Sequence, residues 1–329
     1  MLVRLPPGRV PDRVTPRGPE NPSPPAPAGR YTWAMAHDDG PGRRVLSGPG
    51  GAAADVLAAL PGADLTTVQL EIARRRAARV SGPDVLRRHR DDRFAAPSPL
   101  PFALLRRVED AALGAATGFD LVPLSPLVPL GTHSAVAGVA QHRVVPTGRG
   151  TEVAADPTTG LALEAAVRRS SADVVRLASV QRVVRAQQVP AGLFAHFSLF
   201  GAVTAGRDSG DLAFERQHWA EHARLLAEAC RTLGAAAVEL AVTVLDPRFE
   251  GLLDAVPDVP VRPFPDREGG RGGYYEGLCF KVYASFGGEL AEVGDGGFTP
   301  WTRRLLGNAK ERLMTSGLGV DRLATLLPA

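Results

Sequence analysis

Apolar residues recur every three or four positions in several stretches of the chain, and this spacing predicts amphipathic helices. The clearest stretches are residues 65–80, 102–116 and 219–233. Gly118 and Gly234 follow the last two stretches, as expected where a helix ends. Between residues 52 and 116 we therefore expect separate helices, interrupted by stretches that contain proline.

The pattern changes in the later part of the chain, where continuous apolar runs alternate with helical stretches. The runs at residues 197–203, 237–245 and 277–284 have the length and the content of buried strands. A short apolar helix is expected at residues 322–327, close to the end of the sequence. Strands and helices thus share this part of the chain, which predicts a mixed fold.

The first 50 residues differ from the rest in composition. They contain 11 prolines and 7 glycines, and no apolar segment of the kind found in secretory signals. Such a segment buries too little apolar surface to offset the entropy lost on ordering it. We therefore expect a disordered leader at residues 1–50, a helical segment at residues 51–100 and one larger domain at residues 101–329.

The overall composition is typical of a globular protein, with 44% hydrophobic and 22% charged residues. No run of 18 apolar residues occurs, so we expect no membrane-spanning helix and no membrane partner. Cys230 and Cys279 lie far apart in the sequence. We therefore expect neither a disulfide scaffold nor a cysteine zinc site, and we predict a cytoplasmic protein.

Basic and acidic residues nearly balance, with 38 of the former and 35 of the latter. Lys281 and Lys310 are the only lysines, and every other basic residue is arginine. We interpret this excess of arginine as the codon usage of a GC-rich genome. The arginine runs at residues 74–76 and 87–88 leave RNA-facing helices as an alternative.

Three separated segments carry candidate chemistry. Residues 118–126 follow the helix predicted at 102–116 with a glycine–aromatic turn and a strand that runs into proline. Residues 197–215 contain Arg207 beside a glycine- and aspartate-rich turn, and Phe214 after it. A guanidinium group can hold a phosphate with two hydrogen bonds, and an aromatic ring can stack on a nucleobase.

The third segment is residues 316–323, in which Gly317 and Gly319 would end a strand and Arg322 would open a helix. The N-terminus of a helix favours anions. Together the three segments resemble motifs 1, 2 and 3 of the class II aminoacyl-tRNA synthetases. The resemblance implies an α+β fold with an antiparallel sheet flanked by helices, and a homodimer formed through motif 1. It also implies ATP as the cofactor, with Mg²⁺ left open, bound by Arg207, Phe214, Gly317, Gly319 and Arg322.

Shorter segments narrow the resemblance to histidyl-tRNA synthetase and its paralogues. Arg271 stands shortly before a tyrosine pair that enters a predicted strand, and an Asp-Pro-Thr run and a glycine pair stand where the family has its substrate motifs. The resemblance implies that Arg207 and Arg271 contact the α-phosphate during activation. It assigns the substrate to Asp156, Thr158, Tyr274, Tyr275, Gly296 and Gly297.

The sequence departs from the family near these positions. Ala154 and Ala155 replace the family's arginine and proline before the acid, and Phe298 and Thr299 replace an arginine–tyrosine pair. The sequence also ends after motif 3 without an anticodon-binding domain, so tRNA binding is not expected. We therefore expect a stand-alone protein that binds ATP and adenylates a small carboxylate. A non-catalytic, regulatory or ligand-binding paralogue of histidyl-tRNA synthetase is the alternative.

One further pattern belongs to a different class of protein. His218, Glu221 and His222 fit the H-x-x-E-H pattern of zinc peptidases, and two histidines four residues apart share one face of a helix. The sequence singles out no third ligand, so no metal is predicted and a zinc hydrolase remains only a further alternative. His133 and His142 flank a polar loop and are interpreted as structural.

Overall fold

The computed structural model describes residues 45–186, 195–256, 258–264 and 274–327. Residues 1–44 of the predicted leader and Arg271 lie outside these ranges. The first described helices are α2 (Pro49–Ala58), α3 (Gly62–Ala77) and α4 (Gly82–Asp91), and none of them contains a buried residue. Every helix among the described residues is too short or too polar to span a lipid bilayer.

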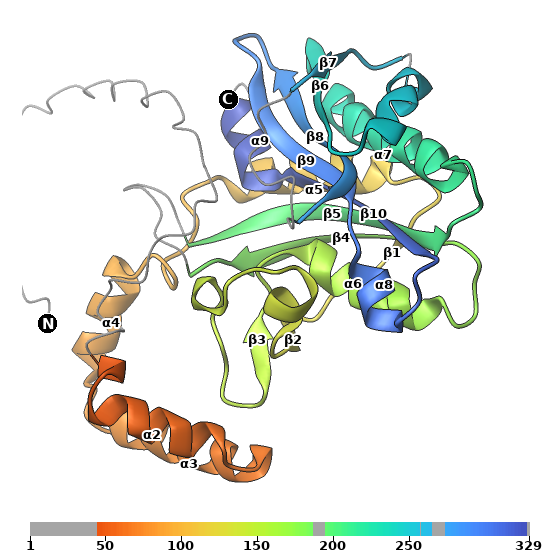
Figure 1. The fold of residues 1–329 in the computed structure, drawn as a ribbon. Coiled ribbons are helices and arrows are strands. Elements are labelled where there is room, and N and C mark those ends of the chain that lie inside the picture. The colour runs from red at the N-terminus through yellow and green to blue at the C-terminus, as the bar shows by residue number, and fades with distance from the viewer. Residues whose placement is uncertain (1–44, 187–194, 257, 265–273, 328–329) are drawn as a thin grey trace, which may run out of the picture. The chain divides into compact units, whose positions relative to one another are not determined.

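An eight-stranded sheet forms the centre of the fold, in the order β1-β4-β5-β10-β9-β8-β6-β7 (Figure 1). Neighbouring strands run antiparallel, except that β1 pairs with β4 and β6 pairs with β7 in parallel. The strands are β1 (Asp120–Leu121), β4 (Val175–Val184), β5 (His196–Arg207), β6 (Ala237–Val244), β7 (Val261–Pro263), β8 (Glu276–Ser285), β9 (Ala291–Phe298) and β10 (Glu311–Gly319). A separate hairpin pairs β2 (Leu127–Pro129) with β3 (Thr151–Val153).

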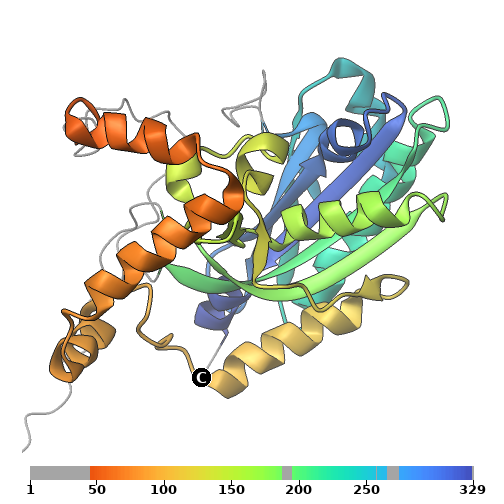
Figure 2. The same ribbon diagram turned by 90° about the horizontal axis from the view of Figure 1, so that it is seen from below.

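Helices cover both faces of this sheet (Figures 1 and 2). One side, which we call the α7 face, carries α5 (Phe102–Ala115), α7 (Ala213–Thr232) and α9 (Val320–Leu326). The other side, the α6 face, carries α6 (Pro157–Arg168), α8 (Trp301–Leu306) and a π-helical turn, η1 (Thr132–Val136). Two 3-10 segments complete the described elements, η2 (Gln141–Arg143) and η3 (Pro247–Ala255).

Side chains of each strand alternate between the two faces. In β5, Phe200 and Ala202 pack with the helices of the α7 face, whereas Val203 and Ala205 pack with those of the α6 face. On the α7 face, the rings of Trp219 and Phe280 are fully buried and meet edge to face, with their centroids 4.9 Å apart. Aromatic side chains bury more apolar area than any others, so this contact anchors α7 on the sheet.

The architecture confirms the predicted fold class, an α+β fold with a largely antiparallel sheet flanked by helices. The helices predicted at 65–80, 102–116 and 219–233 correspond to α3, α5 and α7. The runs predicted as buried strands lie in β5, β6 and β8, and the last predicted helix overlaps α9.

Candidate functional site

The N-terminus of α6 lies directly on the sheet, because a glycine makes room for it. A Cβ atom at Gly201 in β5 would lie 2.9 Å from Cγ of Pro157 and 3.2 Å from Cγ2 of Thr158, which is closer than packed atoms approach. Asp156 caps the helix: its Oδ1 accepts hydrogen bonds from the Thr158 backbone N–H (2.9 Å) and hydroxyl (2.6 Å). The helix start thus holds a carboxylate against the α6 face.

An arginine from the end of β4 meets this carboxylate. Arg185 donates from Nη2 to Oδ2 of Asp156 (3.2 Å) and from Nε to the carbonyl oxygen of Ala155 (3.0 Å). Its guanidinium also lies 5.1 Å from the centre of the Phe197 ring in β5. The sequence analysis missed Arg185. The sequence feature that could have pointed to Arg185 is its position directly after Val183 and Val184, the apolar end of β4.

Tyr274 approaches the same place from the segment that leads into β8. Its hydroxyl is hydrogen-bonded to Thr158, and its ring lies 4.8 Å from Tyr275 and 5.0 Å from Trp301, centroid to centroid. Burial of the hydroxyl, together with the charges of Asp156 and Asp295, raises the pKa of Tyr274 well above its ordinary value. The hydroxyl is therefore protonated at neutral pH and can donate or accept a hydrogen bond.

Glycines and one acid form the strand surface beside this cluster. In the strand register Gly201 faces Gly317, and Gly317 faces Asp295 on the next strand. A Cβ at Gly297 would lie 2.6 Å from the Tyr275 ring, so the absence of a side chain at this position leaves room for the ring. Gly296 points the other way, since a Cβ there would lie 2.5 Å from the Phe280 ring of the α7 face. The predicted glycine pair is thus split between the two faces.

The β10–α9 junction has the strand-to-helix form that the third segment predicts. Gly319 is the residue before α9, and Arg322 lies in the first turn of the helix. Nε of Arg322 donates to the carbonyl oxygen of Glu292 at 3.3 Å, and the side chain is otherwise exposed. Neighbouring Asp321 accepts a hydrogen bond from the backbone N–H of Ser198 (2.8 Å) and lies 3.6 Å from a nitrogen of Arg182. Both contacts tie the start of the helix to the β4–β5 hairpin.

Comparison with known proteins bears on this arrangement. No protein-family model and no curated protein matches the chain. Solved structures are similar to the chain. One is an ATP phosphoribosyltransferase regulatory subunit/histidyl-tRNA synthetase from Bacillus halodurans, with 15% sequence identity and a TM-score of 0.57; the match covers 72% of this chain and 82% of that one. A second similar structure is a histidine–tRNA ligase subunit from Alicyclobacillus acidocaldarius, with 15% identity, a TM-score of 0.53, and coverage of 71% of this chain and 97% of that one. A third is a histidyl-tRNA synthetase from Nostoc, with 14% identity, a TM-score of 0.54, and coverage of 71% and 73%. The chain has a class II synthetase-like fold.

This fold corrects the position predicted for motif 2. The strand-loop-strand interpretation of residues 197–215 is wrong, because β5 is followed by α7 and not by a second strand. The antiparallel hairpin next to this segment is instead β4–β5, in which every residue of β4 pairs with a residue of β5. An arginine near its loop and a phenylalanine after it are present there as Arg185 and Phe197. Residues 187–194 of the loop lie outside the described residues.

Arg207 and Phe214 accordingly lie away from the cluster around Asp156. Arg207 is six residues along β5 from Gly201, or roughly 20 Å at the rise of a strand, and its Nε lies 3.3 Å from Glu311. Phe214 is buried at the start of α7, 4.4 Å from the His218 ring, and packs over Gly206. The class II synthetase-like fold therefore brings together Asp156, Thr158, Tyr274, Tyr275 and Gly297, with Gly317, Gly319 and Arg322 on the adjoining strand and helix.

The H-x-x-E-H pattern lies on α7, and its side chains form a buried hydrogen-bond network. His222 contacts Ser316 Oγ through Nδ1 (2.7 Å) and Thr204 Oγ1 through Nε2 (3.0 Å). Nδ1 of His218 contacts Glu221 (2.7 Å), which also pairs with Arg176. Among the described residues no three histidines, cysteines or acids are grouped so that they could hold a metal ion. The zinc hypothesis therefore gains no support from these side chains.

Proposed function

We propose that the α6 face binds a small molecule that carries an amino group and a carboxylate, and that the protein activates this carboxylate with ATP. One observation carries the proposal: the carboxylate of Asp156 and the guanidinium of Arg185 lie 3.2 Å apart at the start of α6. An acceptor suited to an ammonium group and a donor suited to an anion thus stand side by side, next to the protonated hydroxyl of Tyr274.

The chain's own groups divide the recognition between them. Asp156 would accept hydrogen bonds from the ligand's amino group, and Thr158 keeps that carboxylate oriented through two hydrogen bonds. Arg185 uses Nε and Nη2 in its present contacts and has further N–H groups to offer a carboxylate or a phosphate. The Tyr274 hydroxyl would fix the ligand from the third side.

ATP, accompanied by Mg²⁺, would supply the α-phosphate to which the ligand's carboxylate is joined, with pyrophosphate as the leaving group. Two cationic side chains fit the phosphates: Arg185 beside Asp156, and Arg322, which is largely exposed in the first turn of α9. Catalysis of this type needs positioning and charge neutralisation and no protein nucleophile. Arg185 thereby takes the role that the sequence interpretation gave to Arg207.

A second candidate is a regulatory paralogue that binds the amino acid and does not use ATP. Its support is the likeness to a structure described as an ATP phosphoribosyltransferase regulatory subunit/histidyl-tRNA synthetase, because that description covers both roles. The two candidates share the site around Asp156 and differ in nucleotide binding alone.

Calorimetry and pyrophosphate exchange with the twenty amino acids, each with and without ATP, test the proposal. Asp156→Asn should weaken binding of the amino acid about 10- to 150-fold, because a hydrogen bond to a charged group contributes roughly 1.5–3 kcal/mol. Asparagine also caps helices well, so α6 should keep its start. Asp258→Asn is the matched control, since Asp258 pairs with Arg224 on the surface. Binding that is unaffected by Asp156→Asn would refute the site, whereas binding without exchange would select the regulator.

We also propose a homodimer formed through α5 and the segment after it, as motif 1 implies. The exposed apolar side chains Phe102, Leu121 and Leu130 support this, with 77%, 53% and 54% of their surfaces accessible. A cytoplasmic location is part of the same proposal, because the sequence has only two cysteines, Cys230 and Cys279, and they lie far apart.

A further inference from the structure

A wholly buried carboxylate lies behind the proposed site. Glu152, in the short strand β3, has no exposed surface, and four donors surround its side chain. Oε1 accepts from the backbone N–H of His133 (2.9 Å) and from its Nδ1 (2.7 Å), and Oε2 accepts from the Gly131 N–H (3.2 Å) and from Nε2 of Gln141 (2.7 Å). Burial alone would favour the neutral acid, but these hydrogen bonds outweigh it and lower the pKa of Glu152. Glu152 is thus a carboxylate with every acceptor position in use.

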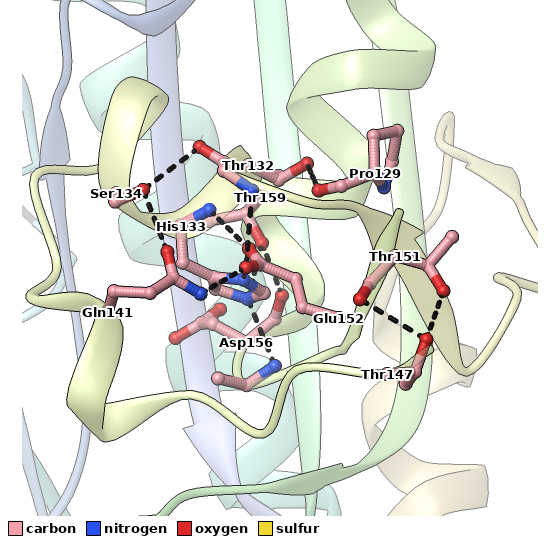
Figure 3. Close-up of polar contacts among 12 residues, drawn as sticks. Pro129, Thr132, His133, Ser134, Gln141, Thr147, Thr151, Glu152, Asp156 and Thr159 are labelled. Carbon is pink, nitrogen blue, oxygen red and sulfur yellow. Dashed lines mark hydrogen bonds and ion pairs between the residues drawn. The ribbon is translucent and has the colours of Figure 1, made fainter. Parts of the chain in front are cut away.

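The contacts of His133 fix which of its nitrogens carries the hydrogen. Nδ1 faces the Glu152 carboxylate, which can only accept, so Nδ1 donates. Nε2 faces the backbone N–H of Ala155 at 3.0 Å, so Nε2 accepts. Figure 3 shows the His133 ring next to Glu152, with Asp156 close by. His133 therefore connects a buried charge to the peptide group immediately before Asp156.

That peptide segment is held from several directions. The N–H of Ala155 donates to His133, and the carbonyl oxygen of Ala155 accepts from Arg185 at 3.0 Å. The carbonyl oxygen of Asp156 itself accepts from the Thr159 hydroxyl at 2.8 Å. The backbone on both sides of the Asp156 side chain is thereby fixed.

His133 sits on an unusual element. The turn Thr132–Val136 is π-helical and begins after Gly131, whose φ of +90° is left-handed. Such turns are rare and occur frequently at functional sites. Here the widened turn presents both the backbone N–H and the ring of His133 to the same carboxylate oxygen.

We propose that Glu152 and His133 form a positioning relay, which holds the Ala155 peptide so that the Asp156 carboxylate is oriented for the amino group of the ligand. The role toward the ligand rests on the proposed function, whereas the relay itself is a property of the protein alone. Neither residue touches the ligand in this arrangement; both act through Ala155 and Asp156. A merely structural role would require the buried pair to support stability without affecting affinity.

Three variants separate these roles. In the wild type the backbone N–H of His133 faces one carboxylate oxygen of Glu152, and the backbone N–H of Gly131 faces the other. In Glu152→Gln the amide NH₂ group must replace one of these oxygens. Whichever way the amide is turned, a donor then faces a donor. His133→Gln keeps an acceptor near the position of Nε2, whereas His133→Leu removes it. His222→Gln is the matched control, since His222 is a buried, doubly hydrogen-bonded histidine on the opposite face.

The experiment uses nuclear magnetic resonance on the full ¹⁵N-labelled chain, with L-alanine as the probe because it carries little beyond the two groups to be recognised. The wild-type spectrum should show His133 neutral with its hydrogen on Nδ1. Glu152→Gln and His133→Leu should weaken L-alanine binding at least about tenfold and speed hydrogen exchange at the Ala155 amide. His133→Gln should bind L-alanine more tightly than His133→Leu does, and His222→Gln should bind it like the wild type, whatever their stability.

Two results would overturn the relay: a hydrogen found on Nε2 of His133, or equal Ala155 exchange rates in His133→Leu and His133→Gln. Its role in binding would be overturned if His133→Leu bound L-alanine as well as the wild type, or if His222→Gln bound it as poorly as His133→Leu. A wild type that binds none of the twenty amino acids would refute the proposed function instead, and the tautomer and the exchange rates would still decide the relay.

Discussion

Acidification is expected to destabilise the protein through one buried histidine, His222. Its ring is fully enclosed and meets the Phe119 ring edge to face at 5.5 Å. Its two nitrogens contact the hydroxyls of Ser316 and Thr204, and a neutral imidazole, with one donor and one acceptor, satisfies both. Burial lowers the pKa of His222 from 6.5 to about 3, and the charge of Glu221 opposes this only in part.

The magnitude follows from the difference between the folded and the unfolded pKa. A lowered histidine pKa means that the unfolded chain takes up a proton below pH 6.5 while the folded chain does not, down to about pH 3. Stability is therefore full above pH 6.5 and falls as the pH drops through this window, by ~2 kcal/mol at pH 5. Glu221 contributes little at pH 5. Burial raises its pKa, but hydrogen bonds from His218 and Arg176 outweigh this and lower it to about 2, so its share is lost mainly between pH 4.5 and 2.

Denaturant unfolding of the wild type and of His222→Gln, at pH 7 and at pH 5, measures this effect. The variant should lose ~2 kcal/mol less between the two pH values than the wild type, because it has no imidazole at this position. A lower stability of the variant at both pH values does not matter, since only the difference is compared. His89→Gln, at an exposed position on α4, is the control and should behave like the wild type. An equal loss in the wild type and in His222→Gln would refute the argument.

Three further outcomes are expected. Arg322→Ala should weaken ATP binding about 10- to 150-fold in a calorimetric titration, and Arg322→Lys should recover only part of it because an ammonium group lacks the guanidinium fork; unchanged affinity would remove Arg322 from the site. Leu121→Arg, which places a charge on an exposed apolar position after α5, should halve the mass seen by light scattering, and a wild-type monomer would refute the dimer. Gly277→Ala should cost about 2–4 kcal/mol in denaturant unfolding, because φ is +71° and the new methyl group would lie 2.3 Å from the Phe249 ring. Gly287→Ala has φ of +92° but open space, so a cost as large as that of Gly277→Ala would show that backbone strain, and not the Phe249 contact, dominates.

The sequence predicted the elements whose hydrophobic period is long and uninterrupted. The helix α5 was found to within a residue, because its apolar side repeats over 14 residues and glycine follows closely. The strands β6 and β8 were found because both of their faces are largely buried, which makes the apolar run continuous. The strand β4 was not predicted, since polar and charged residues interrupt its pattern.

The misplaced hairpin has a local physical cause. Residues after β5 form a tight turn, in which Gly210 has φ of +86° and Asp211 and Leu212 are also left-handed. Its backbone is held by the Asp208 side chain, which accepts from the Gly210 N–H at 2.9 Å. A turn rich in aspartate and glycine fits a hairpin and a helix start equally well. The packing of Phe214 decides between the two, because its ring lies over Gly206 of the assembled sheet. The sequence alone does not show this contact.

The site was predictable where it is local and hidden where it is not. Asp156 and Thr158 adjoin in sequence and cap a helix, so a motif could point to them. Arg185 reaches Asp156 across 29 residues, and Glu152 reaches His133 across 19. His133 was interpreted as structural, and no local signal links it to Ala155. Only the packing of β3 and of the π-helical turn beside α6 brings these groups together.

The two faces of one set of strands explain why buried polar groups have different roles in this protein. On the α7 face the ring of Phe280 fills the space beside Gly296, and His222 is enclosed together with the hydroxyls that satisfy it. On the α6 face Gly201 admits the first turn of α6 to the sheet, which carries the Asp156 carboxylate with it. Both ring nitrogens of His222 are hydrogen-bonded inside the protein, and this residue influences stability. Asp156 instead stands at the N-terminus of α6 and pairs with Arg185, and it is the group on which the proposed ligand would act.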